Sequence, residues 1–306
     1  MRNKVLFFTN ICLLFCLNVS IQAQDLLDKL EQEYPDTPQY QLATFKASRI
    51  SIGHSVETRK KGVLELQAFT RYWNIPNSSG QSFVADKMGA RIGVEYGISD
   101  KLTFGGGWST LDGIFDSFLK YKLIRQRNDG KGAPVSLSLF QNIAYRSERN
   151  PPLIDINRFD NFQDQLSFTT QLLLARKFTP QFSAQISPTY IHRNSSAFTD
   201  DPNNQFAIGV GGRYKIGGHV SIVSEYYYLI NPLESITTYD AFALGVNWEL
   251  SDVMLQFKLT NTWFFSEEAF ITQTPNNFNF NDGNLTFGFN AIFVLHLNQK
   301  DKINTD

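Results

Sequence analysis

The fold is decided by the stretch Asp86-Lys-Met-Gly-Ala-Arg-Ile-Gly-Val-Glu-Tyr-Gly-Ile98. Apolar side chains occupy its even-numbered positions from Met88 to Ile98, and charged residues or glycines occupy its odd-numbered positions from Lys87 to Gly97. Because successive side chains of a β-strand point to opposite faces, this pattern predicts a strand with one apolar and one polar face. The stretch also reaches the roughly 10 residues that a tilted strand needs to cross a membrane.

The same period-two pattern recurs along the chain from Gly62 onward. It predicts twelve strands, over the segments 62–73, 84–98, 101–109, 114–125, 134–145, 162–178, 181–193, 204–216, 219–230, 240–250, 253–264 and 284–297. A soluble β-sandwich also alternates, but its strands are usually about 5–6 residues long, shorter than these segments.

The connections between these segments alternate in length. Tight turns follow the even-numbered segments, at Ser99-Asp100, Asn128-Asp129-Gly130, Thr179-Pro180, Gly217-Gly218 and Ser251-Asp252. Longer loops follow most odd-numbered segments, at 74–83, 146–161, 194–203, 231–239 and 265–283, whereas the connection at 110–113 is short. Outer-membrane barrels have short periplasmic turns and long extracellular loops. We therefore predict an all-β fold, a transmembrane antiparallel β-barrel of about 12 strands over residues 62–298.

The remaining residues are assigned from composition. Arg2 and Lys4 precede an apolar run at 5–19, which predicts a signal peptide over residues 1–23 with cleavage after Ala23. Residues 24–61 form a short N-terminal periplasmic segment, and residues 299–306 form a C-terminal tail. After the signal, no stretch approaches the eighteen apolar residues typical of a membrane-spanning helix. The expected location is the cell outer membrane, reached by secretion.

Cysteine and charge counts exclude several kinds of site. The two cysteines, Cys12 and Cys16, lie within the expected signal peptide, so the mature chain has no disulfide, thiol nucleophile or cysteine metal site. Loss of Arg2 and Lys4 lowers the basic residues from 28 to 26 against 29 acidic residues, a net charge of −3. That balance argues against nucleic acid as a partner.

Several blocks resemble an uncharacterised family of Gram-negative outer-membrane β-barrels, classed as a domain of unknown function. The most distinctive block is Ala43-Thr-Phe-Lys-Ala-Ser-Arg-Ile-Ser-Ile-Gly-His-Ser-Val-Glu57. The other blocks are generic strand sequence, at 94–103, 118–123, 175–178 and 209–214. The resemblance spans most of the mature chain and implies the barrel fold. It implies no activity.

The polar face of the predicted strands carries an excess of basic residues. By parity it holds eleven basic and five acidic side chains, among them Arg91, Glu95, Lys120, Lys122, Arg213, Glu225 and Lys258. Buried charges persist when they are paired, so cross-strand ladders would rigidify a closed barrel. Alternatively, the positive excess lines a wet pore and attracts anions. The sequence leaves both readings open.

The segment before the barrel is a candidate plug. Residues 44–58 combine apolar side chains with charged ones and alternate only weakly, which suits neither a disordered tail nor a lipid-facing strand. Inward-facing glycines leave room in the lumen. We therefore expect Phe45, Lys46, Arg49 and His54 to contact the barrel interior or its periplasmic mouth, with Lys46 and Arg49 paired to inward acids such as Glu95, Glu225 or Glu249.

No catalytic constellation is predicted. The histidines at 54, 192, 219 and 296 are far apart in sequence and are expected to be surface or rim residues. Gly53-His-Ser55 does not match the Gly-x-Ser-x-Gly motif of a nucleophile elbow. Acidic loop residues such as Glu267 and Glu268 are expected to be solvated.

The predicted function is a small passive channel or ligand-conducting pore with a mildly basic lumen. The alternative is a non-conducting structural barrel or one that docks a partner, and a third reading is an outer-membrane hydrolase. We expect no enzymatic activity, no metal and no cofactor. The expected partners are outer-membrane lipid and either a small solute or a periplasmic protein, and no nucleic acid.

Overall fold

The computed structural model describes residues 38–75, 85–147, 161–196, 201–279 and 284–297. The expected signal peptide, residues 24–37 and the tail at 299–306 lie outside the described residues. The chain up to Tyr40 forms one unit, and the chain from Gln41 onward forms another, which contains the barrel. No helix among the described residues is long and apolar enough to cross a membrane.

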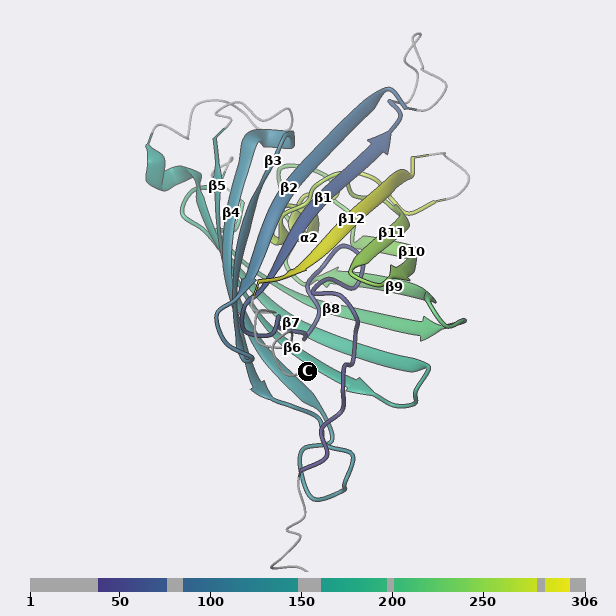
Figure 1. Ribbon diagram of the computed structural model, residues 1–306. Coiled ribbons are helices and arrows are strands. Elements are labelled where there is room, and N and C mark those ends of the chain that lie inside the picture. Colours follow the sequence, from purple (N-terminus) through teal and green to yellow (C-terminus); the bar gives the residue numbers. More distant parts are fainter. Residues whose placement is uncertain (1–37, 76–84, 148–160, 197–200, 280–283, 298–306) are drawn as a thin grey trace, which may run out of the picture. The chain divides into compact units, whose positions relative to one another are not determined.

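Twelve strands form a closed antiparallel barrel (Figure 1). They are β1 (Val63–Trp73), β2 (Lys87–Gly97), β3 (Leu102–Ser109), β4 (Ile114–Ile124), β5 (Ser136–Arg146), β6 (Leu166–Lys177), β7 (Phe182–Arg193), β8 (Asn204–Lys215), β9 (Val220–Leu229), β10 (Ala241–Leu250), β11 (Val253–Thr260) and β12 (Thr286–His296). Each strand pairs with its sequence neighbours, and β1 pairs with β12 from Val63 opposite His296 to Tyr72 opposite Phe287. The predicted strand count and fold class are confirmed.

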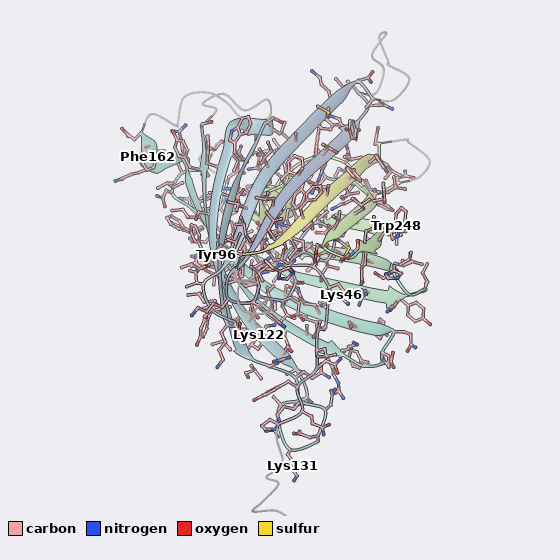
Figure 2. All side chains as sticks on the ribbon, viewed as in Figure 1. Lys46, Tyr96, Lys122, Lys131, Phe162 and Trp248 are labelled. Atoms are coloured by element: carbon pink, nitrogen blue, oxygen red, sulfur yellow. The ribbon has the colours of Figure 1, made fainter. Side chains whose placement is uncertain are left out.

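The two faces of the sheet differ as the alternation requires. On β2, Ile92 and Val94 are 67% and 42% exposed on the outside, whereas Arg91 and Glu95 are buried. Tyr96 and Trp248 also lie on the outer face (Figure 2). This outer belt of apolar and aromatic side chains suits contact with lipid.

The structure shortens two of the predicted strands by four residues at one end. Residues 162–165 form a 3-10 helix, η3 (Phe162–Gln165), because Asn161 and Asp164 cap its start reciprocally. β11 ends at Thr260, where the Asn261 amide donates to the carbonyl oxygens of Asp240 (2.9 Å) and Asn276 (2.8 Å). These two bonds turn the chain out of the sheet and toward the helix α2 (Glu267–Thr272).

Among the described residues, three clusters of buried apolar side chains fill the barrel, and all three include residues from outside the strands. One cluster packs Phe45, Ile50 and Val56 against Phe118 of β4 and Phe140 of β5. Another packs Ile52 with side chains of α2. The barrel core is therefore shared by the strands, the segment that precedes β1 and the loop between β11 and β12.

Candidate functional site

Residues 41–61, which we call the lumenal segment, lie before β1, and their central part, 44–56, runs inside the barrel (Figure 1, purple). All side chains from Thr44 to Val56 are buried except that of Lys46. Residues 48–55 form a tight reversal, the tip, in which Ser55 N donates to Ser48 O (2.8 Å) and Ile50 N donates to Gly53 O (3.0 Å). Arg49 and His54 form a β-bridge across it.

One carboxylate of the barrel wall accepts hydrogen bonds from the backbone amide groups at the end of the tip. Glu225 on β9 accepts hydrogen bonds from the backbone N–H groups of Ser51 (2.8 Å), Ile52 (2.5 Å) and Gly53 (3.2 Å). A carboxylate that accepts several N–H groups forms stronger bonds than a neutral acceptor would. Glu225 therefore anchors the tip by its main chain.

The neighbouring strands bind the carbonyl groups of the same turn. Asn247 on β10 and Gln256 on β11 each donate to Ile50 O at 3.1 Å. Lys258 on β11 donates to Ser51 O. Since buried backbone groups are costly when unpaired, these side chains supply the partners that a strand neighbour would otherwise provide.

The opposite wall binds both arms of the tip. Ser48 Oγ lies 3.0 Å from Glu65 Oε1 on β1 and from Glu95 Oε1 on β2. Lys120 on β4 donates to the carbonyl oxygens of Ser48 (3.0 Å) and Glu57 (3.1 Å). The two arms are thus held by strands on the far side of the barrel from Glu225.

Further contacts come from β5 and β7. Ser138 Oγ donates to Val56 O at 2.7 Å. Gln185 accepts from Val56 N and donates to His54 O, both at 2.8 Å. The lumenal segment is therefore hydrogen-bonded to side chains of β1, β2, β4, β5, β7, β9, β10 and β11.

The helix α2 enters the lumen from the β11–β12 loop and meets the tip. Glu267 is fully buried, and its Oε1 lies 2.9 Å from Arg49 Nη1 and 3.6 Å from His54 Nε2. Glu268, 3% exposed, lies 3.3 Å from Arg193 on β7 and 3.5 Å from Arg146 on β5.

The expectation that Glu267 and Glu268 are solvated is therefore wrong. The two acids are buried because basic side chains of the tip and the wall pair with them. One signal in the sequence pointed to this helix: Ser266 followed by two glutamates and an apolar run is typical of a helix N-terminus.

His54 is also not a surface or rim residue, and that expectation is corrected. Its ring is fully buried, with centroids 4.5 Å from Phe118 and 4.3 Å from Phe140. Burial, together with the positive charges of Arg49, Lys120 and Arg91, holds the pKa of His54 well below its usual value. Burial raises the pKa of Glu267, and the Arg49 charge opposes that rise.

The remaining residues selected from sequence lie along the lumen or its mouth. Arg91 forms a bidentate pair with Asp116 of β4, with contacts of 2.9 and 2.5 Å. Arg213 lies 2.8 Å from Glu249. Lys46, half exposed, lies 3.4 Å from Glu249, and Lys122 lies 2.7 Å from Glu57 (Figure 2). Arg49 pairs with Glu267 of the loop, an acid that the parity of the strands could not identify.

The buried charges of the described residues balance. Eight basic residues (Arg49, Arg71, Arg91, Lys120, Arg146, Arg193, Arg213 and Lys258) and eight acidic residues (Glu65, Glu95, Asp112, Asp116, Asp201, Glu225, Glu267 and Glu268) are buried. Two of those acids, Glu267 and Glu268, come from α2. The basic excess on the strands is thus offset by these two acids together with Asp112 and Asp201, which lie in other connections between strands.

A cavity of about 220 Å³ lies where the lumenal segment meets β10, β11 and β12. It is lined by Lys46, Arg59, Glu249, Asp252 and Met254 together with neighbouring residues. Within the described part of the chain, no group of three or more His, Asp or Glu side chains could hold a metal ion. The arrangement is that of a polar lumen occupied by two inserted segments.

Comparison with known proteins gives one family match. The family model described as "Membrane bound beta barrel domain (DUF5777)" matches residues 45–295, a range that includes the tip, α2 and nearly the whole barrel. No curated protein matches the chain.

Among solved structures, a KdgM porin superposes with a TM-score of 0.47 and 8% identity, over 76% of this chain and 99% of that chain. The structure titled "KdgM porin in complex with disordered oligogalacturonate" gives a TM-score of 0.46 and 7% identity over the same shares. The COG4313 outer membrane channel from Pseudomonas putida F1 gives a TM-score of 0.46 and 12% identity, over 82% of this chain and 100% of that chain.

Proposed function

The chain belongs to this family of membrane-bound β-barrel domains, and from that premise we propose that it is an outer-membrane channel closed by its own lumenal segment. The apolar outer belt supports insertion into outer-membrane lipid, with the long loops outside the cell. The lumenal segment occupies the space that a solute would cross, so conduction requires that the tip leave its place between the walls.

The observation that carries the proposal is the set of hydrogen bonds that hold the tip's main chain, which act alongside the apolar contacts of Ile50 and Ile52. Main-chain groups of Ser51, Ile52 and Gly53 bind Glu225. Other groups of the tip bind side chains of β1, β2, β4, β7, β10 and β11. A permanently closed barrel would be stabilised as well or better by an apolar core. A wall of carboxylates, amides and ammonium groups can instead be hydrated once the tip is released, which supports a channel over a purely structural barrel.

The charges on the wall suggest which solutes would cross. The buried charged residues of the strands are seven basic and four acidic. If α2 moves with the tip, Glu267 and Glu268 leave and this basic excess is exposed. We expect the open lumen to favour small anionic solutes over cationic ones, because a pore lined with one sign of charge attracts the opposite sign.

We assign no catalytic role to the histidines. His54 contacts two phenyl rings and Glu267, and His192 Nδ1 contacts Asn204 (2.8 Å). His296 lies 3.5 Å from Asp252 at the end of the barrel. None of these contacts places a histidine beside a serine hydroxyl, so the hydrolase reading has no geometric support among the described residues.

The test is single-channel conductance of the full-length protein in planar bilayers. Glu225→Ala removes the acceptor of three tip amides and should raise the open probability at least about tenfold, as the loss of charge-assisted hydrogen bonds predicts. Asp129→Ala is the matched control, because Asp129 pairs with Arg127 in the β4–β5 turn. Inserted Glu225→Ala protein that conducts no more than wild type would contradict the proposal.

A further inference from the structure

The wall formed by β9, β10 and β11 binds main-chain groups of the tip. Glu225 accepts three consecutive N–H groups, and Asn247, Gln256 and Lys258 donate to the two carbonyl groups of Ile50 and Ser51. Each of these hydrogen bonds joins a wall side chain to a peptide group of the tip. The same contacts are therefore available to any polypeptide that adopts the same turn.

The wall also imposes a shape. A Cβ atom at Gly53 would meet the phenol of Tyr227 and would lie 3.0 Å from Glu225 Oε1. Tyr227 is itself held in place, because its ring packs edge-on against Phe270 of α2 with centroids 5.1 Å apart. The site accepts a turn with glycine at this position and resists one with a side chain there.

The tip does not satisfy all the polar groups around it. Asn247 Oδ1 is buried without a hydrogen-bond partner, although its amide nitrogen binds Ile50 O. The Ser51 hydroxyl, also buried, has none either. A buried polar atom without a partner costs free energy, so the fit between this tip and this wall leaves room for a better ligand.

We propose that the β9–β11 wall, consisting of Glu225, Tyr227, Asn247, Gln256 and Lys258, is a binding site for a turn of another polypeptide. The inference rests on the proposed function, since the chain's own tip must first leave. The ligand is an oligopeptide that presents three consecutive free amides ending at a glycine. Glu225 favours N–H donors and repels anions, so an acidic sugar or a phosphate would gain nothing from its position.

The site is compatible with an open lumen whose strand wall carries more basic than acidic residues. Most of the surplus basic residues lie on other strands, such as Arg91 on β2, Lys120 on β4 and Arg193 on β7. Peptide main chain would be held at β9–β11, and acidic side chains of the same peptide would face these basic groups.

The experiment uses the full-length protein with Gly53→Val. This substitution should displace the tip from the wall, and it leaves every wall residue unchanged. A fluorescent peptide with the sequence of residues 44–57 is added, and its binding is measured by anisotropy. Saturable binding is expected. The same peptide with valine in place of its glycine should bind about tenfold more weakly, the effect of losing one or two hydrogen bonds. Adding Glu225→Ala to the protein should abolish binding.

A cysteine in place of Ser51 in the Gly53→Val protein reports whether the tip has left, through labelling by a membrane-impermeant thiol reagent. If the thiol reagent labels the tip but the peptide does not bind, the proposed peptide site is wrong, and the channel proposal is unaffected. A tip that stays unlabelled despite valine at 53 overturns the proposed glycine requirement. Equal binding of both peptides also overturns it. If Gly53→Val protein does not insert, Ile52→Pro serves instead, because it removes one amide donor to Glu225 from the tip.

Discussion

Arg49 and Glu267 connect two segments that enter the barrel separately. Arg49 belongs to the tip and Glu267 to α2, and their side-chain atoms lie 2.9 Å apart with almost no exposure to solvent. A buried charge that loses its partner is strongly destabilising, whereas the intact pair contributes much less. This one pair therefore makes the position of the tip depend on the position of the β11–β12 loop.

Reversing one charge of this pair should destabilise the closed barrel, and reversing both should restore it. Arg49→Glu or Glu267→Arg alone is expected to cost roughly 3–5 kcal/mol of the free energy of unfolding, the usual effect of breaking a buried pair. The double variant should recover most of that loss. Urea unfolding of the two single variants and the double variant gives the coupling energy.

The matched control for this cycle is Lys46→Gln, which breaks the half-exposed pair of the same segment with Glu249. An exposed or half-exposed pair contributes only about 0–1 kcal/mol. If the double reversal is as unstable as the sum of the single reversals, the two inserts are not coupled through this pair.

His54 should make the fraction of molecules whose tip lies inside the barrel depend on pH. The pKa of His54 is held well below 6.5 while the tip is seated, by burial first and then by the charges of Arg49, Lys120 and Arg91. The released tip regains an ordinary histidine pKa, so it takes up a proton that the seated tip does not. The free energy that holds the tip in place therefore does not depend on His54 above about pH 6.5. Below that pH it decreases, by at most about 1.4 kcal/mol per pH unit.

Thiol labelling of Ser51→Cys measures this effect when its rate is divided, at each pH, by the rate for an exposed reference, Gly217→Cys, because the reactive thiolate itself becomes scarcer at low pH. This ratio should rise between pH 7.5 and pH 5.5. Glu267 of α2 acts in the opposite sense, because its raised pKa lets the seated state take up a proton at low pH. His54→Gln removes the histidine and should flatten the rise over this range. A rise of equal size in the His54→Gln protein would assign it to another group.

At the scale of elements, the strands were predictable, and the segment before β1 was expected to contact the barrel interior or its mouth, whereas the insertion of α2 was not expected. A strand that separates lipid from a polar lumen must alternate along its whole length, so the pattern at 86–98 has a direct physical cause. The prediction was too long at 162–165 and 261–264. There the ladder is ended by hydrogen bonds of Asn161 with Asp164 and of Asn261 with the carbonyl groups of Asp240 and Asn276. Such bonds leave no periodic trace in the sequence.

The outer face can be tested at two positions of a single strand. Leu244 and Leu250 on β10 are 41% and 40% exposed, and they differ in depth because one is central and the other is the last residue of the strand. Leu244→Arg should cost roughly 2–4 kcal/mol of folding free energy in lipid vesicles, and Leu250→Arg roughly 0–1 kcal/mol. Equal effects of the two substitutions would mean that the outer belt does not lie across a bilayer.

At the scale of the whole molecule, the odd or even position of a residue in a strand shows whether its side chain faces the lumen. It does not show which groups that side chain contacts there. Arg91, Lys120, Glu225 and Lys258 are buried and face inward, as their odd or even positions in the strands require. Their partners come from segments without strand periodicity, so the three amides on Glu225 and the partner of Arg49 depend on how the chain folds back into the barrel. Only the tertiary structure brings these groups together.

The central claim is that the tip closes a channel and that its departure opens it. The most direct test records single-channel current from full-length Ser51→Cys protein while an impermeant, charged thiol reagent is present on one side of the bilayer. Residues 24–306 contain no native cysteine, so the reagent reports position 51 alone.

The account predicts brief openings before the reagent is added. It then predicts stepwise, lasting increases in current, because a labelled tip cannot return to its place beside Glu225. Complete labelling without any change in current would contradict the account.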